Sequence, residues 1–314
     1  MHIIFRILIT IFLLFAISQM VDFTVFGEVL RGFPTWAAAT VVVGYSIGQV
    51  VGGMKWRILA HPAGVNFSRF RAISAYFVGM FFNLFGLGMV GGDLVRGVLV
   101  SGEGVSRTLG LSTVIADRIH GLVVLAFIGG LSAAVFRPEF LDSELIEILV
   151  FIGLGSTIAW IFMPWLTKRI FSSSSRLGQR LSSLARVFTL DSYSLSVATI
   201  YSTFLHLLQI GLHWVVISAL GISIPFHYLL ATVPFVNIIG SLPISWNGLG
   251  VREACYIFFF SSQRHFMSEE QAVAVGLVWL FGMTISAMFG GAFIAFSKDM
   301  SFARLTKRRY PIES

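Results

Sequence analysis

Cysteine and charge are both scarce in this sequence. Cys255 is the single cysteine among 314 residues, so the chain forms no intrachain disulfide. Only 12% of the residues are charged, whereas 56% are hydrophobic and the mean hydropathy is +0.85, which excludes a soluble fold. The sequence instead holds several apolar runs of about 20 residues, the length with which an α-helix crosses a bilayer.

Several chemical motifs are absent as well. The sequence has no G-x-x-x-x-G-K-[ST] loop for the phosphates of ATP, no Cys or His cluster at metal-ligand spacing and no G-x-S-x-G elbow. An ATP-driven pump is therefore disfavoured, and no cofactor or metal is expected. The net charge of +7 lies in loops and a tail, which favours a role in membrane orientation over binding of nucleic acid.

Six apolar stretches are predicted to span the membrane as helices. They are residues 3–21, 35–54, 108–135, 148–166, 194–220 and 271–296, with boundaries that are approximate. The first stretch is interpreted as a retained helix, because its apolar region is too long for a signal peptide and no A-x-A-like cleavage site follows it.

The charges between these stretches predict the orientation of the chain. Segments 54–71, 167–191 and 298–314 carry an excess of Lys and Arg, whereas segment 136–147 carries an excess of acids. Short basic loops face the cytoplasm. We therefore predict a multi-pass protein of a bacterial or archaeal inner membrane, with a basic cytoplasmic loop, a basic cytoplasmic tail and both termini inside.

This orientation requires residues 72–107 and 222–270 to begin and end on the same side of the membrane. Each is predicted to be a re-entrant hairpin or a pair of half-helices, the first entering from the cytoplasm and the second from outside. Irregular backbone at membrane depth is tolerated only beside protein or water. The alternative is eight simple crossings with mixed loop charges.

The two hairpins share a weak internal repeat. FFNLFGLGMVGGDLVR begins at residue 81 and FVNIIGSLPISWNGLGVRE at residue 235, and each places an Asn before a Gly-rich tip that closes on an Arg beside an acid. The pattern predicts an all-α helix bundle, a single membrane domain over residues 1–314, with inverted repeat-like halves at about 35–147 and 194–297. Asn83 and Asn237 are expected to satisfy backbone groups at the breaks.

A family resemblance rests on the pieces GGDLVRGVLVSGEGVSRTLGLSTVIADRIHG, SLPISWNGLGVREA and MKWRIL. In these pieces the sequence resembles the transmembrane-region family of lysylphosphatidylglycerol synthase, a group of flippase-like membrane proteins, from about residue 35 to 296. The resemblance implies movement of phospholipids or isoprenoid-linked lipids, or a place beside the enzymes that make them. The first tip departs from the family in lacking a proline, and the chain ends in a basic tail without an aminoacyl-transferase domain. An enzymatic role is therefore less favoured than transport.

Arg96 and Arg252 are the leading candidates for lipid binding. Ionisable groups inside a bilayer are costly and are therefore functional candidates, and a planar guanidinium at a glycine-rich break can bind two phosphate oxygens at once. The alternative is that each arginine pairs with its neighbouring acid, Asp93 or Glu253, and only braces the tip.

Asp117 and Arg118 lie about 15 Å into the helix predicted at 108–135, close to the middle of the bilayer. Neighbouring residues on a helix point about 100° apart, so each needs a partner on another element. We predict that Asp117 pairs with Arg252, and that Arg118 pairs with Glu253 or with a lipid phosphate.

A polar face on the predicted helix 194–220 carries His206, Gln209 and His213 at i, i+3 and i+7. Such histidines act as hydrogen-bonding contacts between helices, or as a proton relay that couples lipid movement to a proton gradient, because histidine titrates near neutral pH.

The sequence thus predicts translocation of an anionic phospholipid or polyprenyl-phosphate-linked lipid through a basic cavity. One alternative is an integral-membrane transferase in which the carboxylate of Asp93, Asp117 or Glu253 acts as general base. The other is an accessory scaffold for an enzyme of envelope-lipid synthesis. The predicted binding residues are Asn83, Asp93, Arg96, Asp117, Arg118, Asn237, Arg252 and Glu253.

Overall fold

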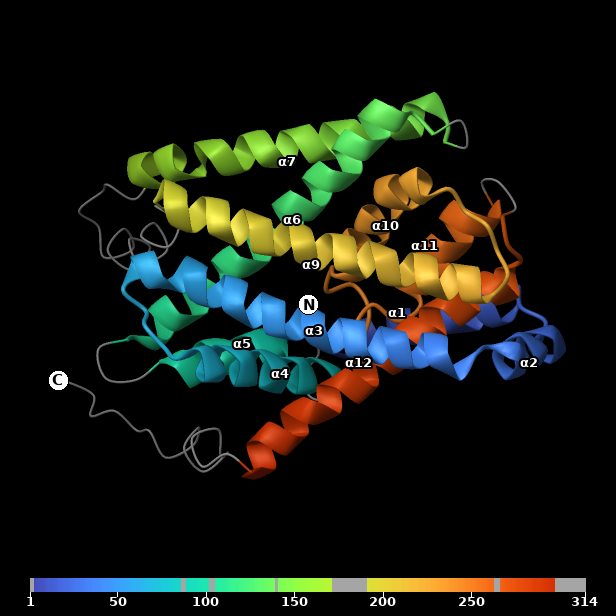
Figure 1. Ribbon diagram of the computed structural model, residues 1–314, viewed down its shortest axis with the longest axis horizontal. Helices are drawn as coiled ribbons and strands as arrows, with labels where there is room; N and C mark the ends of the chain where they lie inside the picture. The colour runs from blue at the N-terminus through green and yellow to red at the C-terminus, as the bar shows by residue number, and fades with distance from the viewer. Residues whose placement is uncertain are drawn as a thin grey trace.

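The computed structural model describes residues 3–85, 89–101, 105–138, 141–170, 191–262 and 266–296. Within these ranges the chain is an all-α bundle without strands, as predicted (Figure 1). Most of the basic loop 167–191 and the whole tail 298–314 lie outside the described residues.

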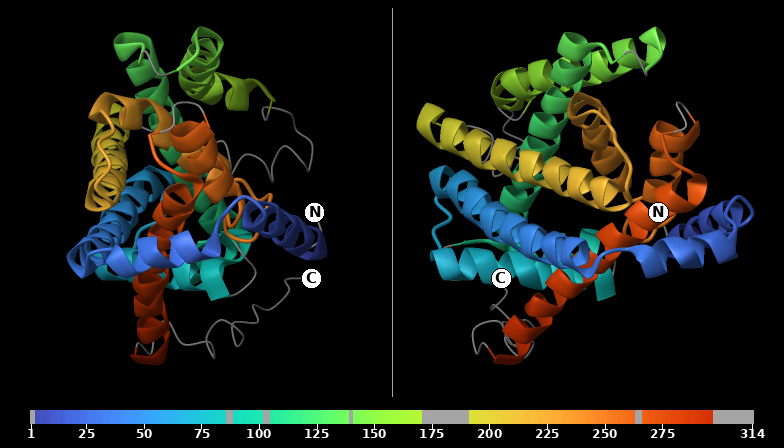
Figure 2. Two further views of the ribbon diagram at one scale, coloured as in Figure 1. Left: turned by 90° about the vertical axis from the view of Figure 1, so that its right-hand side faces the viewer. Right: turned by 45° about the vertical axis from the view of Figure 1, so that its right-hand side comes forward.

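Among the described residues, five helices are long and apolar enough to cross a membrane. They are α3 (Thr35–Ala60), α6 (Arg107–Phe136), α7 (Ser143–Ile170), α9 (Ser192–Ala219) and α12 (Glu269–Phe296). Each corresponds to a predicted span. Figure 2 shows α7 packed on α6 at the periphery of the bundle, where most of its apolar side chains are exposed and available to lipid.

The remaining predicted span, 3–21, is not a straight crossing. Helix α1 (Ile3–Ser18) is followed by α2 (Phe23–Gly32), and the two are bent by 93°. The break has a local cause, because the carboxylate of Asp22 accepts the backbone N–H groups of Thr24 and Val25 and so caps a new helix. The pair forms one broken span at most.

Two helical hairpins return within the bundle. The first consists of α4 (Arg69–Phe85) and α5 (Met89–Val100). The second consists of α10 (Phe226–Gly240) and α11 (Val251–Tyr256), which continues as a π-helix over Ile257–Ser262. In Figure 1 the first hairpin enters from the end of the molecule where α3 ends and α6 begins, and the second enters from the opposite end. This opposed arrangement agrees with the two predicted hairpins.

Serine side chains begin the helix that follows each hairpin. Ser106 Oγ accepts the N–H of Leu109 at the start of α6. Before α12, Ser268 Oγ accepts the N–H of Gln271, and Gln271 Oε1 accepts the N–H of Ser268 in return. This reciprocal pair is a capping box, so both serines cap the N-termini of the following helices, as the sequence pattern indicates.

The first hairpin closes tightly through glycine. A Cβ at Gly92 in α5 would overlap the carbonyl oxygen of Gly79 and the side chain of Asn83, both in α4. The N–H of Gly92 donates to Asn83 Oδ1 at 3.0 Å. This close approach holds α5 against α4 and fixes the direction in which Arg96 points.

Candidate functional site

Both hairpins and the helices α3, α6, α9 and α12 line one cavity of about 210 Å³. Its wall combines charged, amide and hydroxyl side chains, among them Gln49, Gln209 and Ser241, with apolar ones such as Leu125 and Trp279. Seven of the ten residues predicted as lipid-binding or proton-relay residues line it: Asn83, Arg96, Asp117, Arg118, His206, Asn237 and Arg252.

The other three predicted residues lie just behind this wall. Asp93 is bonded to Arg118, Glu253 to the backbone of the second tip, and His213 to Tyr256. Within the described part of the chain, no group of three or more His, Cys, Asp or Glu side chains is placed to hold a metal ion.

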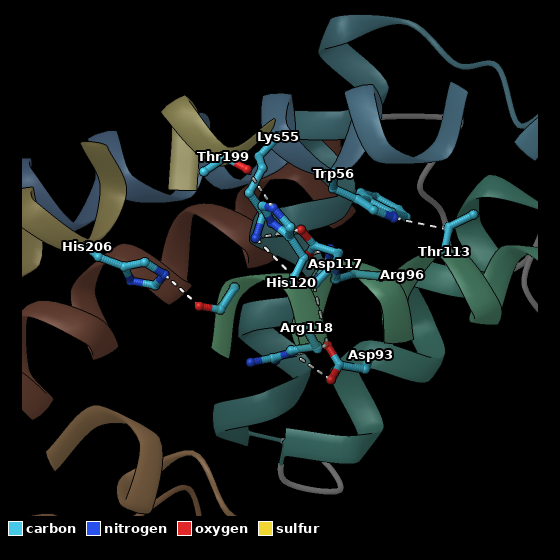
Figure 3. Close-up of polar contacts among 11 residues, drawn as sticks. Lys55, Trp56, Asp93, Arg96, Thr113, Asp117, Arg118, His120, Thr199 and His206 are labelled. Carbon is cyan, nitrogen blue, oxygen red and sulfur yellow. Dashed lines mark hydrogen bonds and ion pairs between the residues drawn. The ribbon is translucent and has the colours of Figure 1, made fainter. Parts of the chain in front are cut away.

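Asp117 is the centre of a buried ion cluster. Arg96 Nη2 lies 2.8 Å from Asp117 Oδ2, and Lys55 Nζ lies 3.0 Å from Asp117 Oδ1 (Figure 3). Lys55 Nζ also donates to the carbonyl oxygen of Asp117 at 3.1 Å. The three side chains are at most 5% exposed, so α3, α5 and α6 are joined by charges shielded from solvent.

Arg96 contacts two aromatic rings in addition to Asp117. Its guanidinium lies 4.5 Å from the ring centroid of Trp56 and 3.9 Å from that of Tyr76. Cation–π contacts of this kind stabilise a desolvated guanidinium. Trp56 is fixed in turn by a hydrogen bond from Nε1 to Thr113 Oγ1 at 3.1 Å. The geometry therefore favours a bracing role for Arg96.

Arg118 borders the cavity in a more open setting. Its Nε lies 2.9 Å from Asp93 Oδ2, and its Nη2 lies 3.0 Å from Asp93 Oδ1. The Arg118 side chain is 37% exposed and that of Asp93 is 24% exposed. Asp93 Oδ1 also lies 3.5 Å from Arg96 Nη1, so Asp93 is close to both arginines (Figure 3).

The second tip is built from left-handed backbone. Asn247, Gly248 and Gly250 all have positive φ, at 54°, 82° and 78°. Glu253 Oε2 accepts the N–H of Gly250 at 2.7 Å, and Glu253 packs where Gly276 of α12 lacks a side chain. The carboxylate of Glu253 therefore caps the N-terminus of α11 and stabilises the tip.

The side chain of Arg252 lies along this tip. A Cβ at Gly240 would lie 3.1 Å from Arg252 Nε, so the guanidinium passes over bare backbone. Its Nε is buried and has no hydrogen-bond partner, and no ion pair reaches Arg252 from any residue that the structure describes. Arg252 is thus a cation at the cavity wall with unused donors.

The predicted pairing of Asp117 with Arg252 was wrong, because Asp117 pairs with Lys55 and Arg96. The pairing of Arg118 with Glu253 was wrong as well, because Arg118 pairs with Asp93. The reason is geometric, because α6 turns both side chains toward α3 and the first hairpin, while the second tip satisfies Glu253 by itself. The alternative partner of Arg118, a lipid phosphate, stays a prediction.

The two asparagines have different roles. Asn83 satisfies the backbone of the first hairpin, as predicted. Asn237 lines the cavity, and its Nδ2 is buried without a partner. An unpartnered buried donor costs free energy. Asn237 therefore offers a second unused donor, on the same hairpin as Arg252.

His206 and His213 are both in contact with other helices. His206 Nε2 lies 3.0 Å from the carbonyl oxygen of Gly121, and its Nδ1 has no partner. His213 Nδ1 lies 2.7 Å from the carbonyl oxygen of Gln209, and His213 Nε2 lies 2.7 Å from the hydroxyl of Tyr256. Of the two, only His206 lines the cavity.

Lys55 was missed as a site residue, because it was counted among the charges of a loop. Helix α3 in fact continues to Ala60, since the sequence contains no proline between Pro34 and Pro62. The signal that would have found it is the presence of Tyr45, Gln49 and Lys55 within one long helical segment, since all three line the cavity.

Comparison with known proteins gives one match. A family model described as the lysylphosphatidylglycerol synthase TM region matches residues 3–290, which include every residue of the cavity wall. No curated protein and no solved structure matches the chain.

Proposed function

The chain belongs to the lysylphosphatidylglycerol synthase TM region family of integral membrane proteins, and from this premise we propose that it moves an anionic lipid across the bilayer. The head group, of a phospholipid or a polyprenyl-phosphate-linked lipid, passes through the polar cavity while the tails stay in the hydrocarbon. Family membership supports a role in lipid chemistry, and the cavity supports translocation.

The observation that carries this proposal is the unpartnered Arg252. Lys55, Arg96, Asp117 and Arg118 are the other charged residues of the cavity wall, and each has an ion-pair partner. An unpaired cation within a membrane protein is costly. A lipid phosphate that entered the cavity would supply the missing negative charge and accept two hydrogen bonds from the guanidinium fork.

The distribution of charge supports the proposed orientation in the cell membrane. Arg57, Arg69 and Arg107 belong to the end of the molecule where α3 ends and α4 and α6 begin, whereas Asp142 and Glu144 flank the start of α7 at the other end (Figure 1). Under the positive-inside rule the first end is cytoplasmic. We propose that both termini lie on this side.

A transferase acting on the same lipids is less well supported. Its general base would need a free carboxylate within reach of substrate. Asp117 is engaged by two cations, Asp93 by Arg118 and Glu253 by the N–H of Gly250. A scaffold for an envelope-lipid enzyme would need no charged residue in the cavity. Substitutions that remove a charge from the cavity wall would therefore leave a scaffold functional but impair a translocator.

The proposal is tested by flipping of fluorescent, acyl-labelled phosphatidylglycerol in proteoliposomes, read out with dithionite. The unmodified protein is expected to flip the lipid faster than protein-free liposomes do. Arg118→Gln is expected to slow flipping about tenfold, since it removes a charge-assisted hydrogen bond. The matched control is Arg31→Gln, which removes an exposed arginine of α2 outside the cavity. Equal rates for the two variants would contradict the proposal.

We also propose that His206 carries protons if transport is coupled to a gradient. His206 faces the cavity with a free Nδ1, whereas His213 has both ring nitrogens within hydrogen-bond distance of a partner. His206→Gln is therefore expected to abolish any acceleration of flipping by an imposed pH gradient. His213→Gln is expected to keep that acceleration and to lower thermal stability. Flipping that ignores the gradient in the unmodified protein would remove this coupling role.

A further inference from the structure

The two arginine–aspartate pairs of the site differ sharply in exposure. In the Arg96–Asp117 pair the side chains are 3% and 1% exposed, whereas in the Arg118–Asp93 pair they are 37% and 24% exposed. The first pair is sealed by Trp56 and Tyr76. The second is open to a ligand that enters the cavity.

The Arg118–Asp93 contact also has the form of a phosphate contact. Two nitrogens of the guanidinium, Nε and Nη2, face the two carboxylate oxygens at 2.9 Å and 3.0 Å. An arginine binds two phosphate oxygens through the same planar fork. The carboxylate of Asp93 therefore occupies the position on Arg118 that a phosphate would take.

Asp93 has a second cation within reach. Arg96 Nη1 lies 3.5 Å from Asp93 Oδ1, one helical turn along α5. An ionised carboxylate left without a partner inside a membrane protein is costly. Asp93 avoids that cost if it moves from Arg118 toward Arg96, which it already approaches.

We infer that the carboxylate of Asp93 competes with the lipid phosphate for binding to Arg118, an inference that rests on the proposed function. The incoming phosphate takes Arg118, and Asp93 shifts to Arg96. The more exposed of the two ion pairs between α5 and α6 is thereby opened, whereas Arg96–Asp117 stays in place. When Asp93 returns to Arg118 it displaces the phosphate, which allows the lipid to leave.

Neutralising Asp93 tests this role because it is expected to strengthen lipid binding while it slows flipping. Asp93→Asn and Asp93→Ser are each expected to bind short-chain phosphatidylglycerol roughly tenfold more tightly than the unmodified protein, since a like charge beside the phosphate is removed. The same variants are expected to flip lipid more slowly, because release is impaired. Binding is measured by isothermal titration calorimetry on the detergent-solubilised full chain, and flipping is measured in proteoliposomes.

The matched control is Asp22→Asn, which also removes one carboxylate but lies at the N-terminus of α2, where asparagine caps a helix equally well. It is expected to change neither binding nor flipping. Unchanged or weaker binding in both Asp93 variants, or failure of both to fold, would overturn the competitor role and identify Asp93 as a brace. In that case binding and flipping by the unmodified protein would still support the proposed function. If the unmodified protein neither bound nor flipped the lipid, the proposed function itself would be contradicted.

Discussion

Replacing Arg252 with glutamine is expected to slow flipping of phosphatidylglycerol roughly a hundredfold. The change removes the one cavity cation that has no protein partner among the described residues. Hydrogen bonds to charged groups contribute about 1.5–3 kcal/mol each, and two of them to a phosphate would lower the barrier by about 3 kcal/mol, which corresponds to that factor.

Two further variants define what Arg252 contributes. Arg252→Lys keeps the charge but loses the planar fork, so we expect an intermediate rate. Arg31→Gln is again expected to match the unmodified protein. Because Arg252 has no ion pair to lose, the thermal stability of Arg252→Gln is expected to be close to normal. An Arg252→Gln protein that folds and flips at the normal rate would mean that the phosphate does not contact Arg252.

Replacing Asp117 with asparagine is expected to have the largest effect on stability. Asp117 is 1% exposed and balances both Lys55 and Arg96, so the variant leaves two buried cations with one less anion. Breaking a buried ion pair in this way costs about 3–5 kcal/mol. Thermal unfolding in detergent, followed by tryptophan fluorescence, measures the loss.

A double variant separates charge imbalance from lost packing. Lys55→Met together with Asp117→Asn removes one charge of each sign and leaves Asp93 near Arg96, so part of the lost stability is expected to return. The control Asp22→Asn is expected to unfold at nearly the normal temperature. If Asp117→Asn itself proved as stable as the unmodified protein, the ion cluster would not be holding α3, α5 and α6 together.

Much of the fold follows from the sequence, because the length of apolar runs and the charge of loops are local properties. Six spans and two opposed hairpins were predicted from these features alone, and five of the spans are single long helices in the described part of the chain. The bend between α1 and α2 was not predicted, because it depends on one residue, Asp22, whose capping role is visible only when the helix direction is known.

The site was predicted as a set of residues but not as a set of contacts. Intramembrane charge marked Arg96, Asp117, Arg118 and Arg252 correctly as neighbours of one cavity. Which acid meets which base depends on the rotation of each helix about its axis, and sequence spacing does not fix that rotation between helices. Lys55 was misplaced for the same reason, since the end of an apolar run is not the end of its helix.

The central claim is that the two hairpins bring Arg118 and Arg252 to one cavity where a lipid phosphate binds. Electron cryomicroscopy of the protein in nanodiscs rich in phosphatidylglycerol tests it most directly. We predict phosphate density within hydrogen-bond distance of Arg252 and beside Arg118, with acyl chains leading out into the bilayer. A well-defined map in which the cavity holds only water, and lipid head groups lie at the two membrane surfaces alone, would contradict the claim.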